Sequence, residues 1–273
     1  MRFLLLFFLL AGAAHAQVRL YTLECGRATA ADGGFLSDTG EYDGKPLSVA
    51  DPCFLVRHPK GTLLWDTGLG DALADVQPGK EKAPGVSGAI GMRVPVKLVD
   101  QLKAIGLAPS DITYVAFSHL HFDHTGNANL FTASTWILNK AELAWGLSPG
   151  AFAVKPETWS AYKGVKTKMI DGDLDLFEDG SVRILKTPGH TPGHQSLLLR
   201  LKRAGAVVLS GDLYHVRENR TYRRVPTFNV ERADTLASMD RIERIVKNTH
   251  ARLVVQHDER DFASLPKFPA FLD

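Results

Sequence analysis

Short apolar runs, rich in β-branched and aromatic residues, recur along this chain and alternate with stretches rich in Gly, Pro, Asp and Lys. Runs of this length and composition predict β-strands. Two of them flank a His-Pro-Lys-Gly turn at 58–61, which predicts a β-hairpin. The predicted strands cover residues 18–23, 54–57, 62–65, 112–117, 135–138, 182–185, 194–201, 206–210 and 253–255.

Helices are predicted at 95–105, 140–147 and 233–248, where the first and last carry apolar residues three or four positions apart. Residues 69–91 show no periodicity and predict a long loop, a common form for a lid or a binding wall. Residues 148–168 are expected to be irregular. Their aromatic side chains either line a pocket or pack in the core: Phe152, Trp159 and Tyr162.

The predicted strand at 112–117 runs directly into a cluster of side chains that can ligate a metal. His119, His121, Asp123 and His124 fall within six positions of a protein that has 10 histidines. In extended chain His119 and His121 point to the same side, and Asp123 and His124 can join them only if the chain turns. The alternative is a polar surface loop after a core strand. The density of ligand types favours a metal site.

The same pattern recurs at three later strand ends. His190 lies in a Pro-Gly-His turn after the strand at 182–185, and Asp212 follows the strand at 206–210. His257 follows the last predicted strand. Asp212 alone would favour a turn cap, but together these residues make seven candidate ligands, enough for two metals and a shared carboxylate. His194 is expected to make a structural hydrogen bond, and His250 to cap a helix.

The amino terminus predicts a signal peptide at 1–16. Arg2 precedes an apolar run at 3–10, and Ala14-His15-Ala16 has the small-x-small form of a cleavage site. The mature part, 17–273, then contains both cysteines, Cys25 and Cys53. An oxidising compartment permits a disulfide between them, and the alternative is two small buried hydrophobes. The sequence therefore predicts a periplasmic or secreted protein.

Bulk composition excludes several classes of partner. The chain is 45% hydrophobic and 23% charged, with a formal net charge of +2, which is ordinary for a globular protein. That balance gives no reason to expect binding to nucleic acid, or to a membrane in the mature form. The expected partner is a small-molecule substrate, and a homodimer is one of the states that the sequence allows.

The ordered ligand pattern resembles the metallo-β-lactamase fold superfamily over nearly all of residues 17–273. An earlier strand-end motif of that superfamily is matched by Asp66-Thr67-Gly68. The resemblance implies a single α/β hydrolase domain, a four-layer αββα sandwich with a dinuclear metal site at one edge of its two sheets. It implies two Zn²⁺, or other divalent ions. His119, His121 and His190 would hold one ion, Asp123, His124 and His257 the other, and Asp212 and a hydroxide would bridge them.

Within the superfamily, the chain is most similar to the N-acyl homoserine lactonases, on residues 51–54, 190–196 and 211–215. This implies an exported, quorum-quenching zinc hydrolase that opens the lactone ring by attack of the bridging hydroxide. Asp123 would pass a proton to the departing alkoxide. Many such lactonases place a tyrosine three positions after the bridging aspartate. This chain has His215 there and Tyr214 one position earlier, so either is a candidate for the substrate contact.

Other readings share these ligands. A phosphotriesterase-like enzyme, or another ester, thioester or β-lactam hydrolase of the same superfamily, is the main alternative. A reading from a different class is an exported zinc-binding protein without turnover, since ligands alone do not prove catalysis. A bridging acid favours the enzyme, because it builds a dinuclear centre with open positions.

Overall fold

The computed structural model describes residues 17–75 and 90–273. The expected signal peptide at 1–16 lies outside these residues, as does most of the loop predicted at 69–91. The described part of that loop contains a short 3-10 helix, Asp71–Asp75, and the start of a strand at Ile90.

The larger of two sheets has eight strands and contains the predicted hairpin, in which Leu55 pairs with Leu64. Four of its strands, β3, β5, β6 and β7, pair in parallel, and the others are antiparallel. In spatial order the strands are β13 (Phe271–Leu272), β1 (Arg19–Ala30), β2 (Leu47–His58), β3 (Gly61–Trp65), β5 (Tyr114–Ala116), β6 (Thr135–Asn139) and β7 (Thr167–Ile170), with β4 (Ile90–Arg93) paired to β1.

The second sheet has five strands and is built from the carboxy-terminal half of the chain. Its single parallel pair joins β11 to β12, so that these two strands end at the same edge. The spatial order is β12 (Arg252–Val254), β11 (Gly205–Leu209), β10 (Gln195–Leu201), β9 (Val182–Lys186) and β8 (Leu174–Asp175).

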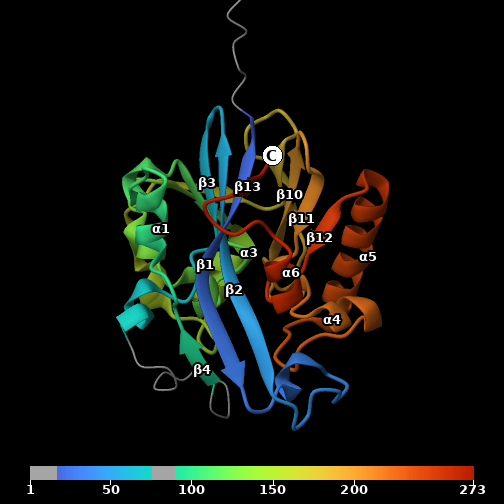
Figure 1. Ribbon diagram of the computed structural model, residues 1–273. Helices are drawn as coiled ribbons and strands as arrows, with labels where there is room; N and C mark the ends of the chain where they lie inside the picture. Colours follow the sequence, from blue (N-terminus) through green and yellow to red (C-terminus); the bar gives the residue numbers. More distant parts are fainter. Residues whose placement is uncertain (1–16, 76–89) are drawn as a thin grey trace, which may run out of the picture.

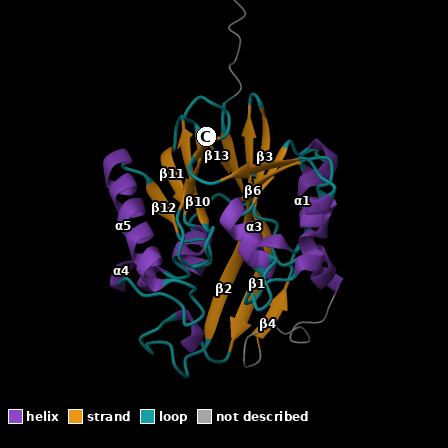
Figure 2. Cartoon of the chain, turned by 180° about the vertical axis from the view of Figure 1, so that it is seen from behind, coloured by secondary structure: helices purple, strands orange, loops and turns teal. Residues whose placement is uncertain are grey.

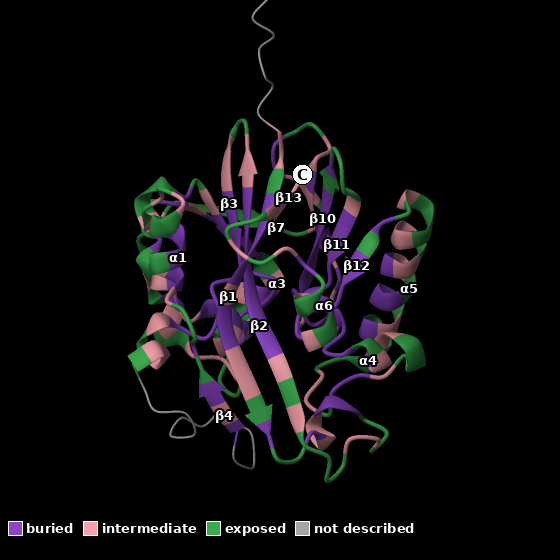
Figure 3. Cartoon of the chain, in the orientation of Figure 1, coloured by how far each residue is buried: buried purple, intermediate pink, exposed green. Residues whose placement is uncertain are grey.

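The two sheets face each other across an apolar core, and helices cover their outer faces (Figure 1). Phe54 and Trp65 of the first sheet meet Leu197 and Leu209 of the second in this core. Figure 2 shows helices α1 and α5 on opposite sides of the strands, and Figure 3 shows that the central strands are mostly buried. The helices are α1 (Leu98–Ala104), α2 (Phe122–Thr125), α3 (Lys140–Gly146), α4 (Arg217–Tyr222), α5 (Arg232–Thr249) and α6 (Glu259–Ala263). The expected αββα sandwich is confirmed.

Each outer face of the sheets has its own apolar cluster, which explains the helical periodicity of the sequence. Leu98 and Leu102 of α1 pack on the first sheet with Leu64 and Trp136. Met239 and Ile242 of α5 pack on the second sheet. No helix within the described residues has the length and apolar content needed to cross a bilayer.

Several elements differ from the prediction. Strand β1 continues to Ala30 through an irregularity between Glu24 and Arg27, where its pairing with β2 shifts. The segment predicted as irregular at 148–168 contains a 3-10 helix at Pro156–Lys163, which packs the fully buried Trp159. Irregular pairing and 3-10 turns leave no strong periodicity in a sequence, so pattern reasoning misses them.

Candidate metal centre

Five loops converge at one edge of the two sheets. The first follows β5, where the turn into α2 brings Asp123 and His124 beside His119 and His121. The loop at 66–68 supports this turn, because the Gly126 N–H donates to the Gly68 carbonyl at 2.7 Å. A Cβ at Gly126 would lie 2.3 Å from the carbonyl carbon of Leu69. Only glycine fits such a close approach of two backbones.

The tandem Pro-Gly-His turn positions His190. Gly189 adopts φ 134° and packs against the start of α5, where a Cβ would lie 2.2 Å from the Thr235 nitrogen. Gly193 approaches the start of α3 just as closely, with 2.3 Å between its ideal Cβ and the Glu142 nitrogen. The two glycines therefore let the His190 loop lie between two helices.

Four buried side chains form a first group of potential ligands. His119 Nε2 lies 2.8 Å from His121 Nδ1, and His190 Nε2 lies 3.2 Å from the same atom. Asp212 Oδ2 lies 3.6 Å from His119 Nε2 and 3.5 Å from His190 Nε2. Ligand atoms this close, all pointing inward, have the arrangement that a divalent cation needs.

A second group lies beside the first. His257 Nε2 is 3.3 Å from His124 Nε2, and Asp123 Oδ2 is 3.9 Å and 4.0 Å from these two nitrogens. The other oxygen of Asp212, Oδ1, is 3.2 Å from His124 Nε2 and 3.0 Å from His257 Nε2. Asp212 thus directs one carboxylate oxygen toward each group, which is the geometry expected of a bridging ligand.

Asp212 is held in place by His194, a residue outside both groups. The backbone N–H of Asp212 donates to His194 Nε2 at 2.9 Å, so the ring carries its proton on Nδ1, which donates to the Thr187 carbonyl at 2.9 Å. Burial lowers the pKa of His194 to about 4, which keeps the ring neutral. The structural role predicted for His194 agrees with these contacts. His250 adopts φ 53° at the carboxy-terminal cap of α5, as its position predicted.

Outer contacts fix the orientation of two ligand rings. Asp66 Oδ2 lies 3.0 Å from His124 Nδ1, and its Oδ1 accepts the Ser118 N–H at 2.6 Å. Asp66 has the left-handed φ of 59°, a strained conformation for a non-glycine residue that is common at functional sites. On the other side, His257 Nδ1 donates to the Ala50 carbonyl at 2.7 Å. Such partners leave the second ring nitrogen free for a metal.

Glu142 connects the two histidine loops and was missed by the sequence analysis. It is buried on α3, where Oε1 accepts the Leu120 N–H at 2.9 Å. Its Oε2 accepts the Thr191 hydroxyl at 2.7 Å and the Gly193 N–H at 2.9 Å. Burial raises the pKa of Glu142 to about 7, although the three donors oppose the rise. Nothing in the spacing of a short amphipathic helix distinguishes such a glutamate from an exposed one.

Replacing Glu142 by Ala is expected to destabilise the protein by roughly 3 kcal/mol, because each buried group left unpaired costs about 1–3 kcal/mol. Urea unfolding followed by circular dichroism measures this change. Glu157→Ala, at an exposed position, is the matched control and should leave stability unchanged. Equal midpoints for both variants would contradict the bridging role of Glu142.

The charge balance of the cluster suits bound cations. Burial lowers the pKa of His119 and His190 well below the usual value, so their lone pairs are free. In the second group burial opposes charge, yet the Asp212 carboxylate raises the pKa of His124 and brings that of His257 to about 9. Cations at this site would displace those protons. Asp212 Oδ1 and His190 Nδ1 are buried without a hydrogen-bond partner among the described residues. The donor set therefore fits two divalent cations.

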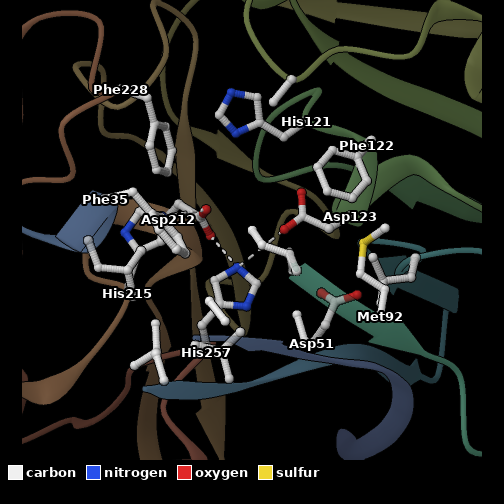
Figure 4. A pocket seen from close by; sticks show the side chains of 18 of the residues that line it. Phe35, Asp51, Met92, His121, Phe122, Asp123, Asp212, His215, Phe228 and His257 are labelled. Carbon is white, nitrogen blue, oxygen red and sulfur yellow. Dashed lines mark ion pairs between the residues drawn. The ribbon is translucent and has the colours of Figure 1, made fainter. Parts of the chain in front are cut away.

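A pocket opens onto this cluster (Figure 4). His215 lines it and lies 3.0 Å from Asp212 Oδ2 through Nε2, but neither ring nitrogen is aligned for a hydrogen bond. Tyr214 is not brought to the site, because its hydroxyl donates to Glu243 on α5 at 3.0 Å. Phe152 lines the pocket, whereas Trp159 and Tyr162 pack against each other in the outer core.

A family model, known relatives and a solved structure all show similarity between this chain and metal-dependent hydrolases. Residues 50–257 match the family model described as Metallo-beta-lactamase superfamily. The N-acyl homoserine lactonase AttM of Azorhizobium caulinodans is 30% identical over 265 residues, covering 94% of this chain and 99% of the relative. The N-acyl homoserine lactonase AiiA of Bacillus thuringiensis subsp. kurstaki is 30% identical over 231 residues, covering 84% and 89%.

A solved structure extends the comparison to three dimensions. It is an N-acyl homoserine lactone hydrolase with the product N-hexanoyl-L-homoserine bound at its catalytic metal center. The two chains superpose with a TM-score of 0.81 at 29% sequence identity, and the match covers 93% of this chain and 98% of the other. The fold is thus similar over nearly the whole length of both chains.

Proposed function

Since this chain belongs to the metallo-β-lactamase superfamily as a metal-dependent hydrolase, we propose that it opens the lactone ring of N-acyl homoserine lactones. The observation that carries this proposal is a mostly apolar pocket that ends at the cluster of potential ligands, where it is lined by His121, Asp123, Asp212 and His257. A polar ring to be hydrolysed would lie at the cluster, and an acyl chain would lie along the apolar wall. That wall is formed chiefly by Ala28, Ala30, Phe35, Leu47, Val49, Met92, Phe122, Phe152 and Phe228.

The residues that would hold the two cations are those of the two groups, with Asp212 common to both. Zinc ions bound there would polarise the lactone carbonyl and lower the pKa of water, so that hydroxide is available near neutral pH. The chain's own groups orient the reaction. His215 has a free ring nitrogen to donate to the carbonyl oxygen as negative charge develops.

Asp123 is the group that we assign to the departing oxygen. Its side chain is 25% exposed and lines the pocket, whereas the neighbouring His124 is fully buried. Addition of hydroxide to the carbonyl carbon is followed by cleavage of the ring C–O bond. The proton that the hydroxide brought, now on the new carboxyl group, passes by way of Asp123 to the leaving alkoxide, and the product is an N-acyl homoserine with a free carboxylate.

A substrate panel tests the proposed function. Metal-loaded protein is incubated with acyl homoserine lactones of several chain lengths, a β-lactam, a thioester and an organophosphate triester, and the products are analysed by mass spectrometry. Addition of one water to the lactone, with the amide intact, is expected. Release of a fatty acid, or preferred turnover of the organophosphate, would contradict the proposal.

We also propose that the protein is exported to the periplasm or secreted. The pattern at 1–16 supports this, and so does the disulfide between Cys25 of β1 and Cys53 of β2, 28 positions apart. A disulfide persists in oxidising compartments and is rare in the cytosol. A mature protein that begins at Gln17 in the periplasmic or culture fraction is the expected result of amino-terminal sequencing.

Replacing both cysteines by alanine is expected to lower the free energy of unfolding by about 3–4 kcal/mol, because a closed loop of this length restricts the unfolded chain. Denaturant unfolding with and without reductant measures the effect. Reductant should destabilise the wild-type protein and leave the double variant unchanged. A wild-type protein that is indifferent to reductant would count against a stabilising disulfide.

A further inference from the structure

One carboxyl group in the pocket has no structural partner. Asp51 lies on β2 and is 3% exposed, and neither of its oxygens has a hydrogen-bond partner within residues 17–75 and 90–273. It lines the same pocket as Asp123 and Asp212, and Figure 4 shows its carboxyl group between His257 and Met92. Buried polar side chains almost always have partners in the folded protein, so this exception calls for an explanation.

The surroundings of Asp51 supply no hydrogen bond, and only the charges of His124 and His257 act in favour of its carboxylate. Burial raises the pKa of Asp51 well above its ordinary value, and the Asp123 carboxylate raises it further. The chain instead leaves room for the group, since a Cβ at Gly26 would lie 2.8 Å from Asp51 Oδ2. An apolar residue would be less costly at this position of the strand. Leu47 and Val49, which share its face of β2 by alternation, are apolar and line the same pocket.

Asp51 is not part of the metal cluster. The seven potential ligands form two groups that do not include it. Among the described residues that line the pocket, leaving aside the ligands and His215, the polar side chains are Thr29 and Asp51. Of these two, Asp51 is the one that is buried and unpaired. Asp51 is therefore available to form a hydrogen bond with a polar group of a bound ligand.

We propose that Asp51 recognises the amide group of the acyl homoserine lactone by accepting a hydrogen bond from its N–H. This inference rests on the proposed function and names the residue that would select amide-bearing lactones. Such a substrate carries one N–H donor, placed between its ring and its acyl chain, and the pocket joins the ligand cluster to the apolar wall in the same way. A carboxyl group keeps an acceptor oxygen in either protonation state.

The test compares two substrates that differ in one atom. N-hexanoyl homoserine lactone has the N–H, whereas α-hexanoyloxy-γ-butyrolactone has an ester oxygen in its place. Asp51→Val should lower kcat/KM for the amide substrate roughly ten- to a hundredfold, mainly through KM. For the ester analogue the change should stay within about threefold. Asp51→Asn keeps an acceptor oxygen and should retain most of the activity on the amide. Asp171→Asn, at an exposed position, is the matched control.

Thermal unfolding supplies a second test, because the proposal predicts a higher Tm for Asp51→Val and a structural role of Asp51 predicts a lower one. Removing an unpaired buried carboxyl group should raise the Tm of Asp51→Val by about 2–4 °C, with metal content unchanged. A lower Tm would identify Asp51 as a structural residue, and equal losses on both substrates, or none, would overturn the inference. In those outcomes the wild-type enzyme still hydrolyses lactones. Failure of the proposed function is different, because the wild type would then hydrolyse neither substrate.

Discussion

Asp212→Asn is expected to lower kcat/KM by more than roughly a thousandfold and to weaken metal binding at both groups of ligands. The two oxygens of Asp212 lie within 3.0–3.6 Å of the imidazole nitrogens of four histidines, which come from three different loops. The amide keeps the shape of the side chain but removes its negative charge and replaces one oxygen with NH₂, so one group loses its shared ligand. Two cations close together would then lack the anion that offsets their repulsion.

Elemental analysis after dialysis measures the metal directly, and steady-state kinetics measures the activity. The wild type should retain two metals per chain and the variant fewer. Asp75→Asn removes a carboxylate that pairs with Lys97 at the surface, and it should behave as the wild type does. One tightly bound metal with full activity in the Asp212 variant would contradict a bridging role.

His215→Phe is expected to lower kcat by about ten- to a thousandfold while metal content stays the same, because one donor to the developing oxyanion is lost. Phenylalanine preserves the edge-to-face contact of this ring with Phe228, in which the centroids lie 5.7 Å apart. Tyr214→Phe is the informative comparison. It removes only the hydrogen bond to Glu243 and should cost about 1 kcal/mol of stability and little activity. A crippled Tyr214→Phe enzyme beside an active His215→Phe enzyme would reverse the assignment.

The ends of the strands can be predicted from the sequence, and with them most of the ligands of the cluster. Apolar runs that stop at His119, His190 or His257 are local signals, and parallel pairing such as that of β11 with β12 brings such ends to one edge of a sheet. Local sequence does not determine which atom each ligand side chain directs toward its neighbours. His121 presents Nδ1 while its partners present Nε2, and this depends on loop conformation that no spacing encodes.

The residues whose environment sequence reasoning missed are those that the tertiary fold buries. Glu142 acts through Leu120 and Gly193, 22 and 51 positions away. Asp51 entered the sequence analysis only within the segment 51–54 that resembles the lactonases, and nothing in that segment predicts that its carboxyl group is buried in a pocket without a hydrogen-bond partner among the described residues. In both cases the informative observation is that a carboxyl side chain, ordinarily exposed and charged, is buried. Burial of a particular side chain becomes visible only when the two sheets have been placed against each other.

The seven ligands are spread over residues 119–257 and come from both sheets, so any cation that binds them also ties together segments that the unfolded chain keeps far apart. The free energy of metal binding then adds to the free energy of unfolding, because the cations bind the native state and not the unfolded chain. Above its dissociation constant, each tenfold rise in free metal adds about 1.4 kcal/mol per site to the stability of the native state. A chain that crosses a membrane unfolded would meet its metal only on the far side. If this protein is exported in that way, the supply of divalent metal in the receiving compartment would set how much of it is folded there.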